Sequence, residues 1–132
     1  MPTFCRDDRL TGPWESTKGQ IRCTFDCAAC FGWIQSCAAT FDFRVWLQPL
    51  APFLSRVGHA HDGEVATRLG LSGIPVAAET VALFTYLELA RATGARLHIT
   101  RLSSAAGLAL IDQARADGMD VTCDVSINHV HL

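Results

Sequence analysis

Apolar and polar positions follow two different periods from residue 41 onward, and the two periods alternate along the chain. Short, mostly apolar runs are typical of buried strands, whereas apolar residues at i, i+3, i+4 and i+7 indicate helices. The pattern predicts strands at 44–48, 95–101 and 119–125, a helix at about 78–93, and a second helix between the last two strands. Because strands and helices alternate, we expect a parallel α/β layer of about three strands.

Glycine and serine mark the ends of the two predicted helices. Gly94 and Gly118 follow the last apolar positions and supply the left-handed residue at which helices commonly stop. Ser103 or Ser104 precedes the second helix, where a serine oxygen accepts a hydrogen bond from a free backbone amide. The apolar stripe of the first helix comprises Val76, Leu83, Tyr86, Leu87 and Ala90, and that of the second comprises Gly107, Leu110, Ile111 and Ala114.

Two stretches lack a sustained period. Residues 49–72 are predicted to form a long polar loop that contains His59 and His61. Residues 1–37 hold five of the six cysteines among scattered glycines and prolines. We therefore expect an irregular, cysteine-containing segment at 1–37 and a separate β/α segment at 38–132.

Length and composition limit the possible folds and partners. A closed eight-stranded barrel needs about 250 residues, so a chain of 132 residues holds at most part of one. A formal net charge of -2 with 18% charged residues indicates neither nucleic-acid binding nor a basic membrane patch. No apolar stretch reaches the ~18 residues of a membrane span, and the first ten residues have no signal-peptide core, so we expect a cytoplasmic protein.

The N-terminal cysteines leave three interpretations open. Cys23, Cys27 and Cys30 have the C-x3-C-x2-C spacing of a three-ligand iron–sulfur cluster, and Cys37 offers a fourth ligand for zinc. Ala29 stands where such cluster motifs carry an aromatic residue. Reduced thiols packed as small core residues are the third interpretation, because a helix would place several of these cysteines on one face.

Histidines and the predicted strand ends supply the other candidate groups. The pairs His59–His61 and His129–His131 have the H-x-H spacing of metal ligands on a strand, but the first lies in the predicted loop and the second at the chain end. His98 is expected to face away from its apolar strand neighbours as a satisfied histidine. Arg101, at the end of that strand, is placed either to grip a carboxylate or phosphate or to form an ion pair with Asp124.

Residues 58–132 resemble the middle-to-late barrel of dihydroorotases and related cyclic amidohydrolases. The most specific strings are RLGLSGIP at 68–75, Ala78-Glu79, and TGARLH at 93–98 followed by Ser103. A weaker match extends the resemblance over 38–132. It implies a partial (β/α)8 barrel, corresponding to about the fifth to seventh strands.

The resemblance also implies a metal site whose ligands are missing here. Active family members hold zinc at the strand ends, and metal-bound hydroxide opens a cyclic amide. The two later histidine ligands should stand near Leu47 and at Arg101, so no metal or other cofactor and no catalytic residue are expected in this chain. The family pattern leaves Arg101, Ser103, Asn128 and His129 as candidates for substrate binding at the barrel mouth.

Two functions follow from this resemblance. The first is a non-catalytic dihydroorotase-like protein of pyrimidine biosynthesis that is a structural partner of aspartate transcarbamoylase. The alternative is a fragment of an active dihydroorotase, or of another cyclic amidohydrolase that hydrolyses a cyclic amide C–N bond. Because the outer strands of a partial barrel would lack neighbours, we also expect self-association.

Overall fold

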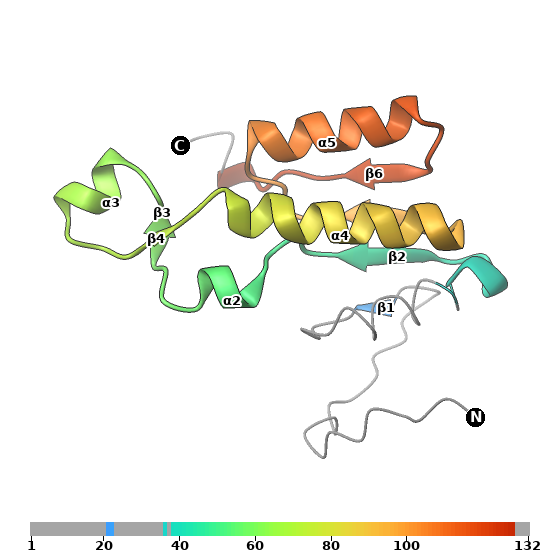
Figure 1. The fold of residues 1–132 in the computed structure, drawn as a ribbon, viewed down its shortest axis with the longest axis horizontal. Coiled ribbons are helices and arrows are strands. Elements are labelled where there is room, and N and C mark those ends of the chain that lie inside the picture. Colours follow the sequence, from blue (N-terminus) through green and yellow to red (C-terminus); the bar gives the residue numbers. More distant parts are fainter. Residues whose placement is uncertain (1–20, 23–35, 37, 129–132) are drawn as a thin grey trace, which may run out of the picture.

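The computed structural model describes residues 21–22, 36 and 38–128, and their central feature is a parallel sheet covered by two helices (Figure 1). The strand order in this sheet is β1-β2-β5-β6, with every neighbouring pair parallel. The strands are β1 (Ile21–Arg22), β2 (Arg44–Leu47), β5 (Arg96–Ile99) and β6 (Val121–Cys123), and the helices are α4 (Ala77–Thr93) and α5 (Ala105–Ala116). The predicted α/β layer is confirmed, with each predicted strand and helix in its place.

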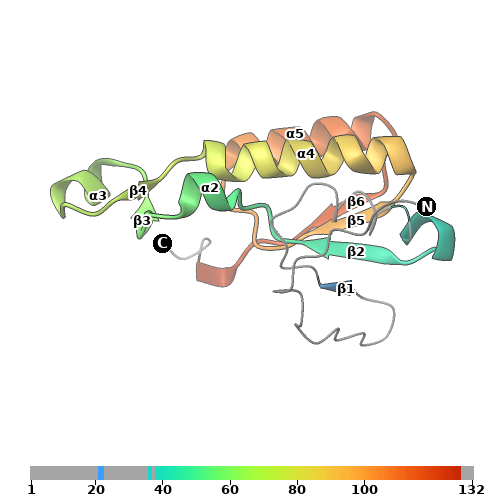
Figure 2. The same cartoon turned by 60° about the horizontal axis from the view of Figure 1, so that its bottom comes forward.

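One face of the sheet forms the hydrophobic core. Successive side chains of a strand point to opposite faces, so Val45, Leu47, Leu97 and Ile99 turn together toward α4 and α5, where they are almost fully buried. Figure 2 shows both helices on this side of the sheet. The alternate residues face the other side, and the register aligns Trp46, His98 and Thr122 in one row across three strands.

The helix ends follow the predicted chemistry. Gly94 and Gly118 have φ values of 74° and 85°, the left-handed conformation that a helix stop requires. Ser104 is the N-cap of α5, and its side chain accepts a hydrogen bond from the Gly107 amide. The assignment of Val76 to the apolar stripe was wrong: it precedes α4 and is 39% exposed. No helix in the described part of the chain is long and apolar enough to cross a membrane.

The prediction of a long loop at 49–72 was wrong, because this stretch contains short helices and a strand. Its elements are α2 (Pro52–Ser55), β3 (Ala60–His61) and α3 (Glu64–Arg68), and β3 pairs in parallel with β4 (Gly73–Ile74). They extend beyond the end of the sheet toward which the strands point (Figure 1). β3 and β4 hold two residues each, too few to show alternation, and α2 and α3 hold four and five, too few to show a helical repeat.

The outer strands of the sheet are partly protected. The expectation that both lack neighbours was wrong for β2, because β1 pairs with it at Val45 and Trp46. The Asp120 carbonyl and the Asp124 amide form hydrogen bonds with β5. Because backbone groups alternate in direction along a strand, the Val121 carbonyl points away from the sheet. Arg115 of α5 donates from Nε to that carbonyl at 2.9 Å. A charged side chain on an edge carbonyl hinders pairing with another strand.

The core predicts a contrast between two positions of α5. Ile111 is 0% exposed and Leu108 is 44% exposed. Ile111→Ala should lower the free energy of unfolding by about 2–5 kcal/mol, because it removes buried methylene groups and leaves a cavity. Leu108→Ala, the matched control on the same helix, should change it by less than about 1 kcal/mol. Urea unfolding followed by circular dichroism measures both, and equal losses would contradict this account of the core.

Candidate functional site

A pocket of about 710 Å³ lies at the carboxyl ends of the sheet strands. Its polar lining comes from residues that follow three strands: Gln48 after β2, Arg101 and Ser103 after β5, and Asn128 after β6. His61 of β3 contributes from the extension. Sites in parallel β/α folds form at this end, where strand ends and helix amino termini converge.

The structure brings together three of the four predicted mouth residues. Arg101, Ser103 and Asn128 all line the pocket, although they are far apart in the sequence. His129 lies outside the described residues, as do the cysteines at 23–37. A role in substrate binding stays a prediction for all four residues.

Arg101 has two contacts that differ from the predicted ion pair. Its φ is 55°, a left-handed conformation that is uncommon outside glycine. Its backbone amide donates to Asp124 Oδ1 at 2.7 Å, while its guanidinium donates to the side-chain oxygen of Gln48. The alternative of an ion pair between the Arg101 guanidinium and Asp124 was therefore wrong. The left-handed backbone at Arg101 presents its amide, and not its guanidinium, to the carboxylate.

The Asp124 carboxylate is held in its charged form. The hydrogen bond from the Arg101 amide lowers the pKa of Asp124 below its ordinary value, and partial burial opposes this shift. A hydrogen bond from His98 and the charges of His98 and Arg101 lower the pKa further. Hydrogen bonds to the ionised form favour that form.

His98 has a partner for each ring nitrogen. Nδ1 lies 2.8 Å from Thr122 Oγ1, and Nε2 lies 3.0 Å from Asp124 Oδ2. Thr122 Oγ1 also accepts from Arg44 Nη1 at 3.2 Å and donates to the Leu97 carbonyl at 3.4 Å. Because the ionised Asp124 carboxylate can only accept, Nε2 donates the hydrogen of that bond. The ring also packs on Trp46, with 4.2 Å between ring centroids, as expected for a satisfied histidine.

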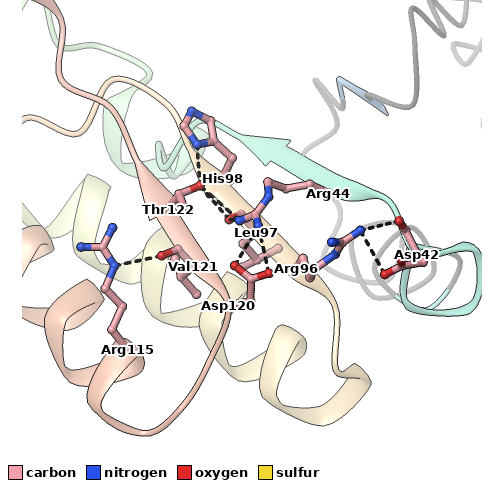
Figure 3. A network of polar contacts seen from close by, with 9 residues as sticks. All are labelled: Asp42, Arg44, Arg96, Leu97, His98, Arg115, Asp120, Val121 and Thr122. Carbon is pink, nitrogen blue, oxygen red and sulfur yellow. Dashed lines mark hydrogen bonds and ion pairs between the residues drawn. The ribbon is translucent and has the colours of Figure 1, made fainter.

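Figure 3 shows how arginines cross the open face of the sheet. Arg44 reaches from β2 over β5 and donates to both carboxylate oxygens of Asp120, at 2.8 and 2.9 Å. It also donates to the Leu97 carbonyl at 3.0 Å. Arg96 pairs with Asp42 at 3.0 Å. Both arginines therefore have a carboxylate partner within the chain, although Arg96 Nε is buried without a hydrogen-bond partner in the described part of the chain. Arg101, which lines the pocket, is paired with the neutral amide of Gln48.

Glu79 is a site residue that the sequence reasoning missed. It is 7% exposed, and its carboxylate accepts four hydrogen bonds from the residues that begin α5. The donors are the Ser103 amide and hydroxyl at 2.8 and 2.5 Å and the Ser104 amide and hydroxyl at 3.0 and 2.5 Å. Its spacing of four from Leu83 places it on the apolar stripe of α4, a signal that a buried carboxylate needs partners. We call this contact the Glu79 clasp.

Gly107 makes room for the Glu79 clasp. A Cβ atom at this position would lie 2.6 Å from Glu79 Oε1 and 2.9 Å from Leu102 Cδ1. The approach of α4 to the first turn of α5 therefore requires a residue without a side chain. The clasp also commits the Ser103 hydroxyl to Glu79, although the residue lines the pocket.

The described residues do not fit the metal site of active family members. Leu47 is 2% exposed and packs in the helix-side core. Arg101, at the other expected ligand position, presents a guanidinium to Gln48. Among the residues the structure describes, no three His, Cys, Asp or Glu side chains are grouped to hold a metal ion.

Solved hydantoinase structures share this arrangement of strands and helices. A D-hydantoinase matches 80% of the chain with a TM-score of 0.64 and 16% identity, over 24% of its own length. The L-hydantoinase from Arthrobacter aurescens matches 84% of the chain with a TM-score of 0.58 and 22% identity, over 25% of its length. The fold is thus a segment of a TIM-type (β/α)8 barrel.

Curated relatives narrow this class to one family, although no family model matches the chain. The dihydroorotase-like protein of Pseudomonas aeruginosa is 48% identical over 95 residues, which cover 72% of this chain and 22% of the relative. The dihydroorotase of Carboxydothermus hydrogenoformans is 40% identical with the same coverage. The chain belongs to the dihydroorotase family and spans 22% of the length of these relatives, which confirms the resemblance seen in the sequence.

The Glu79 clasp predicts a large effect from a small change. Glu79→Gln keeps the shape of the side chain but removes its charge and turns an amide donor toward serine donors. The free energy of unfolding should fall by about 1.5–3 kcal/mol, the range for hydrogen bonds to charged groups. Glu88→Gln is the control on the same helix, since this exposed ion pair with Arg91 is worth less than about 1 kcal/mol. Similar values for the two variants in urea unfolding would argue against the clasp.

Asp124 predicts a pH dependence of stability. Because its pKa is lowered on folding, its contribution is present above its ordinary value of about 3.9 and is lost as the pH falls through the folded pKa. The wild type should therefore melt at a higher temperature than Asp124→Asn near neutral pH, and this difference should shrink as the pH falls below about 3.9. Thermal melts over that range measure it. The control Asp112→Asn, at an ion pair of 3.9 Å, should show a small difference, and a constant difference for Asp124→Asn would refute the assignment.

Proposed function

We propose that this chain is a non-catalytic, dihydroorotase-like component of pyrimidine biosynthesis that acts in the cytoplasm as a structural partner of aspartate transcarbamoylase. The observation that carries the proposal is Arg101, which stands where the family pattern requires a histidine ligand. The 48% identity to a protein named dihydroorotase-like, rather than dihydroorotase, supports the same view.

Charge explains why Arg101 opposes a metal site. A histidine ligand offers a lone pair, whereas a guanidinium is always positive and has none to offer. A metal ion and the Arg101 guanidinium would lie only a few ångströms apart, and two positive charges at that distance repel strongly where water is partly excluded. Arg101 is also fixed by its backbone contact with Asp124 and its side-chain contact with Gln48. The substitution therefore removes a ligand and adds a repulsive charge.

Exposed apolar side chains support a role in association. Four of them stand on α2 and α3 and the turns that follow them, where Phe53 is 68%, Val57 71%, Val65 70% and Leu69 67% exposed. Burying apolar surface yields about 25 cal/mol per Å², so a few hundred Å² would supply several kcal/mol. Self-association or a complex with the transcarbamoylase would cover this surface.

A second candidate is part of an active cyclic amidohydrolase that hydrolyses a cyclic amide C–N bond. The observation that favours it is the 40% identity to a protein named dihydroorotase. Since the chain spans 22% of that relative, the catalytic groups would have to come from outside this chain.

Sedimentation with aspartate transcarbamoylase tests the proposed role. The chain should form a complex at micromolar concentration, and Phe53→Ser combined with Val65→Ser should weaken it at least tenfold. Phe84→Ser is the matched control, because Phe84 is 56% exposed but lies on α4. The chain alone should show no hydrolysis of dihydroorotate. Absence of a complex would refute the partnership, and stoichiometric zinc with hydrolysis that a chelator abolishes would establish the second candidate.

A further inference from the structure

We propose that Asp62-Gly63, between β3 and α3, is a modification site at which aspartate isomerises to isoaspartate. The chain has two Asp-Gly pairs, Asp62-Gly63 and Asp117-Gly118. Both are prone to this reaction, because glycine has no Cβ atom to hinder attack by its nitrogen on the preceding side chain. Their surroundings differ, and this difference assigns the reaction to Asp62. The inference does not depend on the proposed association with aspartate transcarbamoylase.

The reacting groups of Asp62-Gly63 are free to meet. The Asp62 side chain is exposed, and its carboxylate takes part in no hydrogen bond or ion pair with another described residue. Gly63 is the N-cap of α3, and its amide donates to no backbone carbonyl in the same part of the chain. Neither group therefore has to break a bond before the amide nitrogen reaches the carboxyl carbon.

The second pair, Asp117-Gly118, is held in place at the end of α5. Asp117 Oδ2 accepts from Arg91 Nη2 at 2.8 Å, and Oδ1 accepts from Gln113 Nε2 at 2.9 Å. The Gly118 amide donates to the Arg115 carbonyl at 2.9 Å. These bonds oppose the rotation that would bring the Gly118 nitrogen onto the carboxyl carbon. The reaction at this pair therefore requires local opening first.

The isomerisation needs only water. The Gly63 nitrogen attacks the protonated side-chain carboxyl of Asp62, so that a C–N bond forms and one carboxyl oxygen leaves as water with the carboxyl and amide protons. Water then adds to the backbone carbonyl carbon of the resulting succinimide ring, and the bond from that carbon to the Gly63 nitrogen breaks. The main chain now runs through the Asp62 side chain, the α-carboxylate is free, and the mass is unchanged.

The product changes the start of α3. One extra carbon atom enters the main chain directly before Gly63, whose carbonyl accepts from the Thr67 amide and hydroxyl, both at 3.1 Å. The neighbouring strand β4 leaves little room, because a Cβ atom at Gly73 would lie 2.8 Å from Asp62 Cα. Isomerisation should therefore loosen the first turn of α3.

Mass spectrometry with electron-transfer fragmentation distinguishes isoaspartate from aspartate at each position. In the full chain incubated at physiological temperature and digested with trypsin, isoaspartate should form at Asp62 at least about tenfold faster than at Asp117, because bonds to a charged group must break at the second site. In concentrated urea the two rates should become similar, since unfolding removes those bonds. Equal rates in the folded chain, or the same inequality in urea, would overturn the proposal.

Gly63→Ala tests the attacking group. The added methyl group hinders the attack and should slow isomerisation at Asp62 at least about tenfold. The fold should tolerate the change, because Gly63 has an extended φ of -176° and the added Cβ atom would lie 3.7 Å from His61 Cδ2, an ordinary contact. An unchanged rate in the folded variant would show that Gly63 is not the attacking residue.

The converse variant releases the protected pair. Arg91→Met combined with Gln113→Met removes both partners of the Asp117 carboxylate and should raise isoaspartate formation there toward the rate at Asp62. Both substituted positions are on helices, and methionine is a good helix former. A rate at Asp117 that stays low in the folded double variant would show that these bonds do not determine which pair reacts.

Discussion

The Glu79 clasp is the interaction on which the strand-end region depends. A buried carboxylate is costly unless it is hydrogen-bonded, and Glu79 meets this condition by accepting four bonds from Ser103 and Ser104. The bonds fix the start of α5 against the first turn of α4. They also fix the short connection from β5 to α5, which carries Arg101 at the pocket wall. The start of α5 and the connection that carries Arg101 are thus both held by one side chain.

The open face of the sheet satisfies its own charges. In a complete barrel this face would point inward, where unpaired charges are expensive. Arg44 ties β2 to Asp120 across β5, and Thr122 links Arg44 to His98. The face therefore has a connected polar network instead of a dry core. Such networks favour one strand register, because a shift by one residue would move every member to the helix side.

The sequence predicted the regular part of the fold well and the strand-end region less well. Period and helix-stop residues were sufficient for β2, β5, β6, α4 and α5, because the strands lie in apolar or alternating runs and glycine or serine bounds the helices. The elements at 52–74 were missed because they are held by backbone pairing, as in the bond from the Asp62 amide to the Ile74 carbonyl. Such pairing leaves no periodic trace in so few residues.

The site residues show the same division. Their convergence was predictable, because the carboxyl ends of parallel strands meet at one edge. Their partners were not: the bond of Arg101 to Asp124 uses the backbone at a φ of 55°, and no residue pattern encodes that turn. Glu79 was visible in the sequence as a lone carboxylate on an apolar stripe. A buried carboxylate needs several donors, and the two serines before α5 supply them.

At position 101, where the resemblance implies a histidine ligand, the arginine lies among neighbours whose metal-binding atoms are already engaged. Asp124 is an oxygen donor of the kind that metals accept, but it takes bonds from the Arg101 amide and from His98. His98 in turn uses its other nitrogen on Thr122, so no lone pair is left for a metal. Restoring a histidine at position 101 would therefore not restore a metal centre by itself. The pocket persists because its shape depends on the Glu79 clasp and the strand register, neither of which involves a metal ligand.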